Sequence, residues 1–478
     1  QATSVFAKSN NMVVKKAPFS AEKYTLPSVN EEEAATWMKA SEKKRKPANS
    51  SMIDESMMSK ELKAARAHLY TIKTSEAMEA FLNDLDKNYD SSPTDLKFYI
   101  TQMMPTKAFR GIFYRLKPLF EGKSNFVHSQ ILTTAKGIST RTNVFLPYDH
   151  AEAGFEYVSS PYLLENGNMA PAFEDEMAVQ IWMAEELLPL VRIANARLEK
   201  LNLTDAIVWD QKMVFGNQSF ADGINRFKLI GEFEKNLALS ASYGSITAIA
   251  TMRAYSVENS VKLYKDIGFL YGFDGFGIFN KIDGVSAEKV AKQMRKATYN
   301  ETGKLLPDGK DWMKYAYNAS LQSLKAITRA WNLSSDARKD ENLYVFNTNY
   351  IGVNRDEIHD NLEILNRVIT SKDAETLRSG VTGEVVQLNY SKLFLSPPED
   401  LKSFLPTKFD ENKKSSREVT LANGSKKTLS YRNYAEGSAI GWDLKKFENY
   451  FPSIKSNDDV YRTVRVLNHI QGNWLVLR

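Results

Sequence analysis

Asn236 to Met252 of the chain reads NLALSASYGSITAIATM and contains no charged residue. It lies inside a longer stretch from Asp222 to Asp283 that is rich in apolar side chains. The run is shorter than the ~20 apolar residues of a membrane-spanning helix, and it is dotted with hydroxyl groups. We therefore expect a core helix, whose buried face follows three- and four-residue spacings through Ile224, Phe227, Ile230, Phe233, Leu237 and Ala241.

Small side chains occupy the middle of this run, from Ser240 to Ser245. Small residues at a helix contact allow two backbones to approach closely. Ile246, Ile249 and Met252 then continue the apolar face. The sequence thus predicts one neighbouring element packed tightly against the centre of the core helix.

Helical periodicity extends over a body that we assign to residues 51–380. Two successive apolar stripes predict an antiparallel helix pair, the first with Met58, Leu62, Ala65 and Leu69 and the second with Met78, Phe81, Leu82 and Leu85. Further helices are expected over residues 287–297, 311–331 and 355–371. The predicted fold class is mainly α, with a multi-helix body of antiparallel helix pairs.

The character of the chain changes beyond Gly380, and residues 381–478 predict a small α+β unit. Apolar residues between Val385 and Leu395 indicate strands. Two β-rich segments flank Asn423 and Gly424, a strong turn dipeptide, and this arrangement predicts a hairpin.

Residues 1–50 carry nine Lys or Arg against five Glu, which accounts for most of the net charge of +5. Pro18 and Pro27 indicate an extended arm, and the Ser28 and Glu31 spacing predicts the start of a short helix. An ordered arm must be held by its own body or by a neighbouring subunit. The candidate partner-binding residues are basic, although a solvated loop also explains the second cluster: Lys15, Lys16, Lys43, Lys44, Arg45 and Lys46.

The sequence offers little catalytic chemistry. The absence of cysteine excludes disulfides and thiolate chemistry, and no serine-hydrolase elbow, Walker loop or HExxH pattern is present. Glu185, Glu186 and Asp274 are the carboxylates that a catalytic hypothesis would use, while helix-dipole compensation and solvation explain the acidic residues around that helix without chemistry. His359 and Glu363 are four residues apart and could bind one metal ion together. Exposed polar residues on the surface of a helix have the same spacing and explain the pair without a metal. We expect no cofactor.

Alternating glycines and aromatic residues follow the core helix and suit either a tight corner between helices or a groove for a ligand, lined by Tyr271, Phe273, Phe276 and Phe279. This run supports an alternative function, that of an exported bacterial hydrolase or ligand-binding protein.

The favoured function is that of a non-enzymatic structural or assembly protein that docks through its basic N-terminal arm. Its expected partners are other subunits of an assembly, with weak contact to nucleic acid and no transmembrane segment. Because the chain starts at Gln1, we expect proteolytic maturation, with an arbitrary chain boundary as the plainer explanation. The setting favoured by the basic arm and the absence of cysteine is a bacteriophage virion, as an internal or head-associated protein. The bacterial periplasm or envelope is the alternative.

Overall fold

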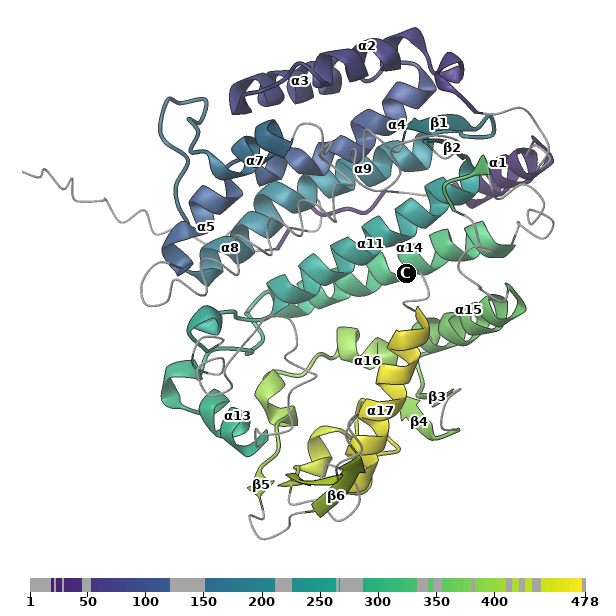
Figure 1. The fold of residues 1–478 in the computed structure, drawn as a ribbon. Helices are drawn as coiled ribbons and strands as arrows, with labels where there is room; N and C mark the ends of the chain where they lie inside the picture. The colour runs from purple at the N-terminus through teal and green to yellow at the C-terminus, as the bar shows by residue number, and fades with distance from the viewer. Residues whose placement is uncertain are drawn as a thin grey trace, which may run out of the picture.

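The computed structural model describes residues 19–20, 23–27, 30–44, 53–120, 151–210, 226–263, 266, 287–332, 343–346, 355–379, 383–409, 415–420, 426–431 and 440–474. The fold is mainly α, as predicted, with small antiparallel two-stranded sheets (Figure 1). The longer helices of the body are α1 (Glu31–Lys44), α2 (Lys60–Leu69), α3 (Ser75–Lys87), α4 (Thr94–Met103), α5 (Ile112–Phe120), α7 (Ala151–Ser159), α8 (Glu176–Trp182), α9 (Leu188–Lys200), α11 (Glu232–Ala254), α13 (Ala287–Met294), α14 (Gly309–Asn332) and α15 (Arg355–Thr370).

Helices α11 and α14 form an antiparallel pair at the centre of the body (Figure 1). The Ser323 hydroxyl donates to the Ser240 carbonyl oxygen over 2.8 Å, and two turns further along α11 Thr247 lies beside Ala316. At the far end, any Cβ added to Gly309 would collide with the Ala254 carbonyl oxygen. The predicted close approach is confirmed, since small residues on both helices let the two backbones run side by side.

The buried face of α11 differs from the predicted one. Leu239, Tyr243, Ile246 and Ala250 are fully buried, whereas Ala241 is exposed. The expected start of the helix was also wrong, because residues 227–230 form a strand, β2 (Phe227–Ile230). Ile224 lies outside the described residues.

The helix begins only at Glu232, where the Glu234 carboxylate accepts a hydrogen bond from the Gly231 amide over 3.0 Å. The preceding residues pair instead with β1 (Ile207–Asp210), which satisfies their backbone groups in an antiparallel ladder. Apolar spacing alone does not distinguish a short buried strand from a helical turn.

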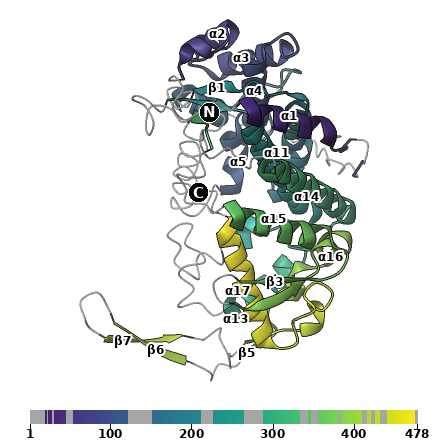
Figure 2. The same cartoon turned by 90° about the vertical axis from the view of Figure 1, so that its right-hand side faces the viewer.

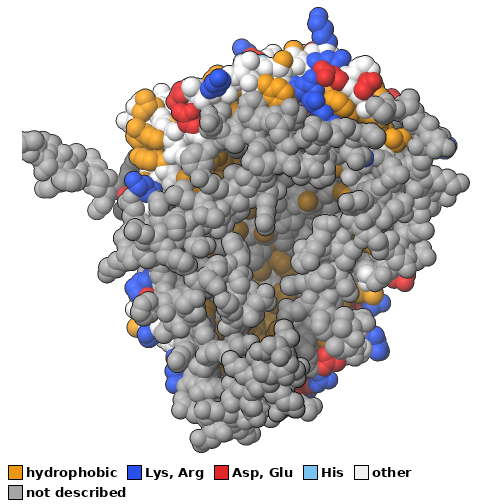
Figure 3. Space-filling model, viewed as in Figure 1, with side chains coloured by type: hydrophobic (Ala, Val, Ile, Leu, Met, Phe, Trp, Pro, Cys, Tyr) orange, Lys and Arg blue, Asp and Glu red, His pale blue; other side chains and the backbone are white. Residues whose placement is uncertain are grey.

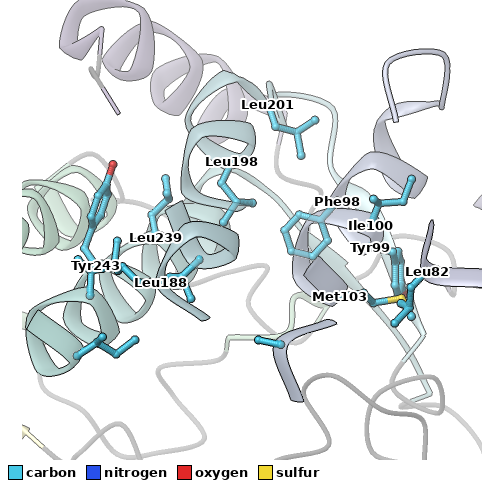
Figure 4. Packing of buried hydrophobic residues seen from close by; sticks show 14 of the residues in the cluster. Leu82, Phe98, Tyr99, Ile100, Met103, Leu188, Leu198, Leu201, Leu239 and Tyr243 are labelled. Carbon is cyan, nitrogen blue, oxygen red and sulfur yellow. The ribbon is translucent and has the colours of Figure 1, made fainter. Parts of the chain in front are cut away.

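The other body helices pack outward from this central pair in layers. On one side α9 contacts α11, α4 contacts α9, and α2 and α3 lie beyond them; on the other side α15 contacts α14 (Figures 1 and 2). Figure 4 shows the resulting core, in which Leu239 and Tyr243 of α11 lie near Leu188 and Leu198 of α9. The stripes predicted for α2 and α3 are confirmed, with Leu62, Leu69 and Met78 almost completely buried.

A buried carboxylate fixes β1 to this body. Asp210 is fully buried and accepts hydrogen bonds from Arg66 over 2.9 Å and from Arg226 over 3.0 and 2.8 Å. Its amide donates to the Tyr99 hydroxyl over 2.8 Å. Two guanidinium groups compensate the desolvation of one carboxylate, so the site ties β1 to α2 and to the start of β2.

The C-terminal part contains β3 (Glu375–Arg378), β4 (Val385–Leu388), α16 (Tyr390–Leu395), β5 (Lys408–Phe409), β6 (Ser415–Thr420), β7 (Lys426–Tyr431), β8 (Ile440–Gly441) and α17 (Asn457–Trp474). The strands pair as β3 with β4, β5 with β8 and β6 with β7. The predicted hairpin is confirmed as β6 and β7, which project from the body in Figure 2.

One strand prediction in this part was wrong. Residues 390–395 form helix α16, capped by the Asn389 side chain, which accepts from the Lys392 amide over 3.0 Å. The aromatic rings of Tyr390 and Phe394 pack against Tyr317 of α14, with centroid distances of 6.4 and 6.0 Å. One helical turn brings the two rings to within 4.9 Å of each other, whereas an extended strand would separate residues four apart by about 13 Å. Packing of these two rings against α14 therefore favours a helix over a strand in this segment.

Substitution of two alanines in α11 tests which face is buried. Ala250→Leu adds volume where no space exists and should lower the free energy of unfolding by roughly 1–3 kcal/mol. Ala241→Leu, the matched control in the same helix, should change it by less than about 0.5 kcal/mol because the side chain points to solvent. Urea unfolding midpoints followed by circular dichroism measure both. Equal effects would contradict the assigned face.

Candidate functional site

An extended N-terminal segment lies against the surface of the helical body. Its described residues are 19–20 and 23–27, which we call the anchored segment. Tyr24 is 3% exposed, and Phe19 and Leu26 pack on the main hydrophobic core. The segment has no helix or strand of its own. Its apolar side chains are buried by contact with the surface of the helical body.

That surface, which we call the arm seat, comprises Glu185, Arg192, Trp312 and Tyr315. The Tyr24 ring lies 4.6 Å from the Trp312 ring and 6.1 Å from the Tyr315 ring, measured between centroids. Phe19 stacks on Tyr24 at 5.4 Å and meets Trp312 edge-on at 5.1 Å. Such aromatic contacts contribute beyond the area that they bury.

Polar groups set the direction of the anchored segment across the arm seat. The Tyr24 hydroxyl donates to the Glu185 carboxylate over 2.9 Å, and the Lys23 ammonium pairs with the same carboxylate. Arg192 donates to the backbone carbonyl oxygens of Lys23 and Thr25, the latter over 3.1 Å from Nε. Burial, followed by the hydrogen bond to Glu185, raises the pKa of the Tyr24 hydroxyl, so this group stays a donor at physiological pH.

The Trp312 side chain of the arm seat is held in place by residues of the helical body. Arg253 of α11 pairs with Asp308 over 3.1 and 3.3 Å, and the Trp312 indole NH donates to the same carboxylate over 3.1 Å. The Arg253 guanidinium also lies 5.5 Å from the Trp312 ring. These contacts hold the Trp312 ring through groups that do not belong to the anchored segment.

Glu185 and Glu186 are adjacent in an irregular turn and reach different partners. Residues Met183–Leu187 form a π-helical turn between α8 and α9, in which the Leu188 amide bonds to the Met183 carbonyl oxygen. Pro189 lacks an amide and lies in the first turn of α9, where the π-helical turn ends. Glu185 faces the anchored segment, whereas Glu186 forms a bidentate pair with Arg115 over 2.7 and 2.9 Å.

The structure therefore does not bring Glu185 and Glu186 together as an acid and base pair. Each carboxylate pairs with a cation of another element, and this arrangement attaches the anchored segment and helix α5 to the same helical turn. The third candidate, Asp274, and the aromatic residues Tyr271, Phe273, Phe276 and Phe279 lie outside the described residues.

The other predicted site residues show no cluster. His359 Nδ1 lies 3.8 Å from Glu363 Oε1 on the exposed face of α15. Within the described ranges, no three His, Cys, Asp or Glu side chains gather in a way that could hold a metal ion. Lys43 is exposed and Lys44 pairs with exposed Asp205 over 2.6 Å, while Lys15, Lys16, Arg45 and Lys46 fall outside the described residues.

The start of α1 also differs from the prediction. The Glu33 amide bonds to the Asn30 side chain over 3.0 Å, so Asn30 caps the helix. Ser28, the predicted cap, is outside the described residues. Ala34 and Met38 are buried, which fixes α1 to the body.

A buried charged network joins α9, α11 and α14, and it is the other candidate for chemistry. Glu232 pairs with Lys235 over 2.6 Å, and Glu199 lies 3.3 Å from both Arg329 and the Tyr243 hydroxyl. Burial raises the pKa of Glu199 against the lowering effect of Arg329, and burial lowers the pKa of Lys235.

The members of this network satisfy one another. The Lys235 ammonium also donates to the Leu201 carbonyl oxygen over 2.7 Å, and Arg329 Nε donates to Asn236 over 2.9 Å. Two acids and two bases that bond within a packed core act as a structural clamp between helices. We assign it no catalytic role.

No protein-family model, curated protein or solved structure matches the chain. The functional argument therefore depends on the geometry of the molecule. No helix among those described is both long and apolar enough to cross a membrane. Figure 3 shows hydrophobic side chains of described residues near the centre of one face of the molecule.

Sequence reasoning missed the arm seat. The arm was characterised by its prolines and its charge, whereas the useful signal is its aromatic content. Phe19, Tyr24 and Leu26 are apolar residues spaced along a segment that also contains polar residues and proline, which is typical of a docking peptide. Nothing in the sequence indicates which distant residues receive it.

Removal of the Tyr24 hydroxyl or ring tests the anchoring. Tyr24→Phe loses one hydrogen bond to a charged group, worth about 1.5–3 kcal/mol. Tyr24→Ala also opens a cavity beside Trp312 and should cost about 3–5 kcal/mol. Trypsin cleavage after Lys23 in the native protein should therefore accelerate by about tenfold or more for Tyr24→Phe, and further for Tyr24→Ala, because cleavage follows the released population.

Tyr255→Phe is the matched control. The Tyr255 hydroxyl donates to the Pro398 carbonyl oxygen over 3.0 Å, a partner that does not belong to the arm seat. Cleavage after Lys23 should not change in this variant. Equal cleavage rates in all four proteins would show that the segment is not held by the arm seat.

Proposed function

We propose that this protein is a non-enzymatic structural component of a larger assembly, which engages its partners through the basic N-terminal arm. The observation that supports the proposal most directly is the anchoring of residues 19–20 and 23–27 on the body. A chain that fixes Phe19 at a defined place on its body also fixes the position from which the preceding residues start.

The charge of the preceding residues supports a docking role. Residues 1–18 contain Lys8, Lys15 and Lys16 and no acidic residue. A short basic segment attracts acidic protein surfaces and phosphate groups, and the attraction weakens as salt is added. Other subunits are the proposed partners, with weak contact to nucleic acid as a secondary interaction.

The proposed setting is a bacteriophage particle, with the bacterial envelope as the alternative. The absence of cysteine and the localised basic charge fit an internal virion protein close to packaged DNA. The competing proposal, an exported hydrolase or ligand-binding protein, has no supporting observation among the described residues, where Glu185 and Glu186 serve as anchors.

Truncation at the root of the arm tests the proposal. Removal of residues 1–18 leaves Phe19, Tyr24 and α1 in place, whereas removal of all 50 residues would also strip Tyr24, Ala34 and Met38 from the core. We expect the full chain to form large particles in mass photometry, and the chain without residues 1–18 to be released as a smaller, folded species.

A charge variant separates the effect of charge from that of length. Lys15→Gln with Lys16→Gln keeps the arm length and should weaken assembly most at low ionic strength, where electrostatic attraction is strongest. Circular dichroism must show unchanged helix content in both variants. If the full chain is a monomer and neither change alters its mass, the assembly function is wrong.

A further inference from the structure

Among the described strands, β6 and β7 pair only with each other, in a two-stranded antiparallel ribbon. The register runs over six residue pairs, from Ser415 opposite Tyr431 to Thr420 opposite Lys426. Figure 2 shows the ribbon extending away from the helices. A two-stranded ribbon is only marginally stable in water by itself. An element of this kind gains stability when a partner covers one of its faces.

The register sorts the residues of the ribbon into two faces of different chemistry. Successive residues of a strand lie on opposite faces, and residues directly opposite each other in the two strands share a face. The other face contains Glu418 and Lys426, whose charges cancel, and otherwise hydroxyl residues. The first face, which we call the basic face, contains two basic residues, three apolar residues, one serine and no acidic residue: Arg417, Lys427, Val419, Leu429, Tyr431 and Ser415.

The composition of the basic face indicates a polyanionic partner that also offers apolar contacts. Duplex DNA meets both conditions, because Arg and Lys bind its phosphates and base edges, while apolar side chains contact thymine methyl groups. A carboxylate on this face would repel phosphate, and the basic face has none. Basic residues on edge strands also oppose pairing with a strand of another copy. Charge complementarity therefore favours DNA as the occupant of this face.

The dimensions of the ribbon agree with this partner. Its six residue pairs span roughly 20 Å at about 3.4 Å per residue, with the two strands about 4.8 Å apart. The major groove of B-form DNA is about 12 Å wide and admits a two-stranded β-ribbon. The major groove of duplex RNA is deep and too narrow for side chains to read. The geometry thus distinguishes DNA from RNA.

We propose that the ribbon of β6 and β7 binds duplex DNA in the major groove through its basic face. Arg417 and Lys427 neutralise phosphate groups, and the apolar residues of the same face contact the groove. The inference goes beyond the proposed function, because it assigns DNA binding to an element other than the N-terminal arm and does not require that copies assemble.

Two adjacent lysines of β7 provide matched variants for a test. Lys427→Gln removes one charge from the basic face, and Lys426→Gln removes one from the opposite face. Fluorescence anisotropy of a labelled DNA duplex of about 20 base pairs, at about 50 mM salt, measures the Kd of the full chain. Lys427→Gln should raise the Kd at least about threefold and Arg417→Gln/Lys427→Gln at least about tenfold, whereas Lys426→Gln should change it by less than about twofold.

The salt dependence of binding gives a second readout. The slope of log K against log salt concentration becomes shallower by roughly 0.9 for each phosphate contact that is lost. The double variant should therefore reduce the slope by about 1.8. Repetition in the Lys15→Gln/Lys16→Gln background lowers the contribution of the arm, and the effect of the ribbon variants should be the same there.

Several results would overturn the proposal. Equal weakening by Lys426→Gln and Lys427→Gln would refute the assignment to one face. Equal binding of duplex RNA of the same sequence would refute groove recognition, and competition by polyglutamate as strong as that by unlabelled DNA would indicate an acidic protein partner instead.

Unchanged DNA affinity with increased aggregation of the double variant would show that the basic residues only protect the strand edges. Circular dichroism must show unchanged helix content in every variant. The ribbon variants leave residues 1–50 unchanged, so a failure of this proposal leaves the assembly function intact, and mass photometry tests that function separately.

Discussion

The antiparallel contact between α11 and α14 is the constraint on which the rest of the structure depends. Small residues along both helices bring the backbones together, and each helix then offers a second face to the surrounding elements. Helix α9 packs on α11, and α15 and α16 pack on α14. The pair also fixes the arm seat, because Arg253 at the end of α11 holds Asp308 and Trp312 at the start of α14.

The parts of the fold that sequence predicts well are those in which one apolar period runs without interruption. The charge-free run, α14 and α15 satisfy this condition, and Asn423 and Gly424 mark the hairpin. Residues 227–230 and 390–395 were predicted wrongly, because short apolar runs fit a strand or a helical turn equally well. Strand pairing with β1 decided the first and aromatic packing on Tyr317 the second.

The site was less predictable than the fold. Glu185 and Glu186 were proposed as catalytic candidates, whereas the structure pairs them with Lys23 and Arg115, partners that sequence patterns do not reveal. Tyr24 and Arg192 were not recognised at all, since their partners are distant in the chain. A basic, proline-containing arm predicts mobility, whereas two aromatic residues within it are enough to fix its root to the body. The basic residues of the arm indicate which partners it attracts, and the packing of Phe19 and Tyr24 on Trp312 determines where the arm is attached to the body.

The central claim is that the body binds the segment at residues 19–27 through the arm seat. Amide hydrogen exchange of the full chain, followed by mass spectrometry on a peptide covering these residues, tests it most directly. The account predicts slowed exchange in this peptide, loss of that protection in Arg192→Ala, and unchanged exchange over residues 236–252. Exchange at the rate of an unstructured chain in the unmodified protein would contradict it.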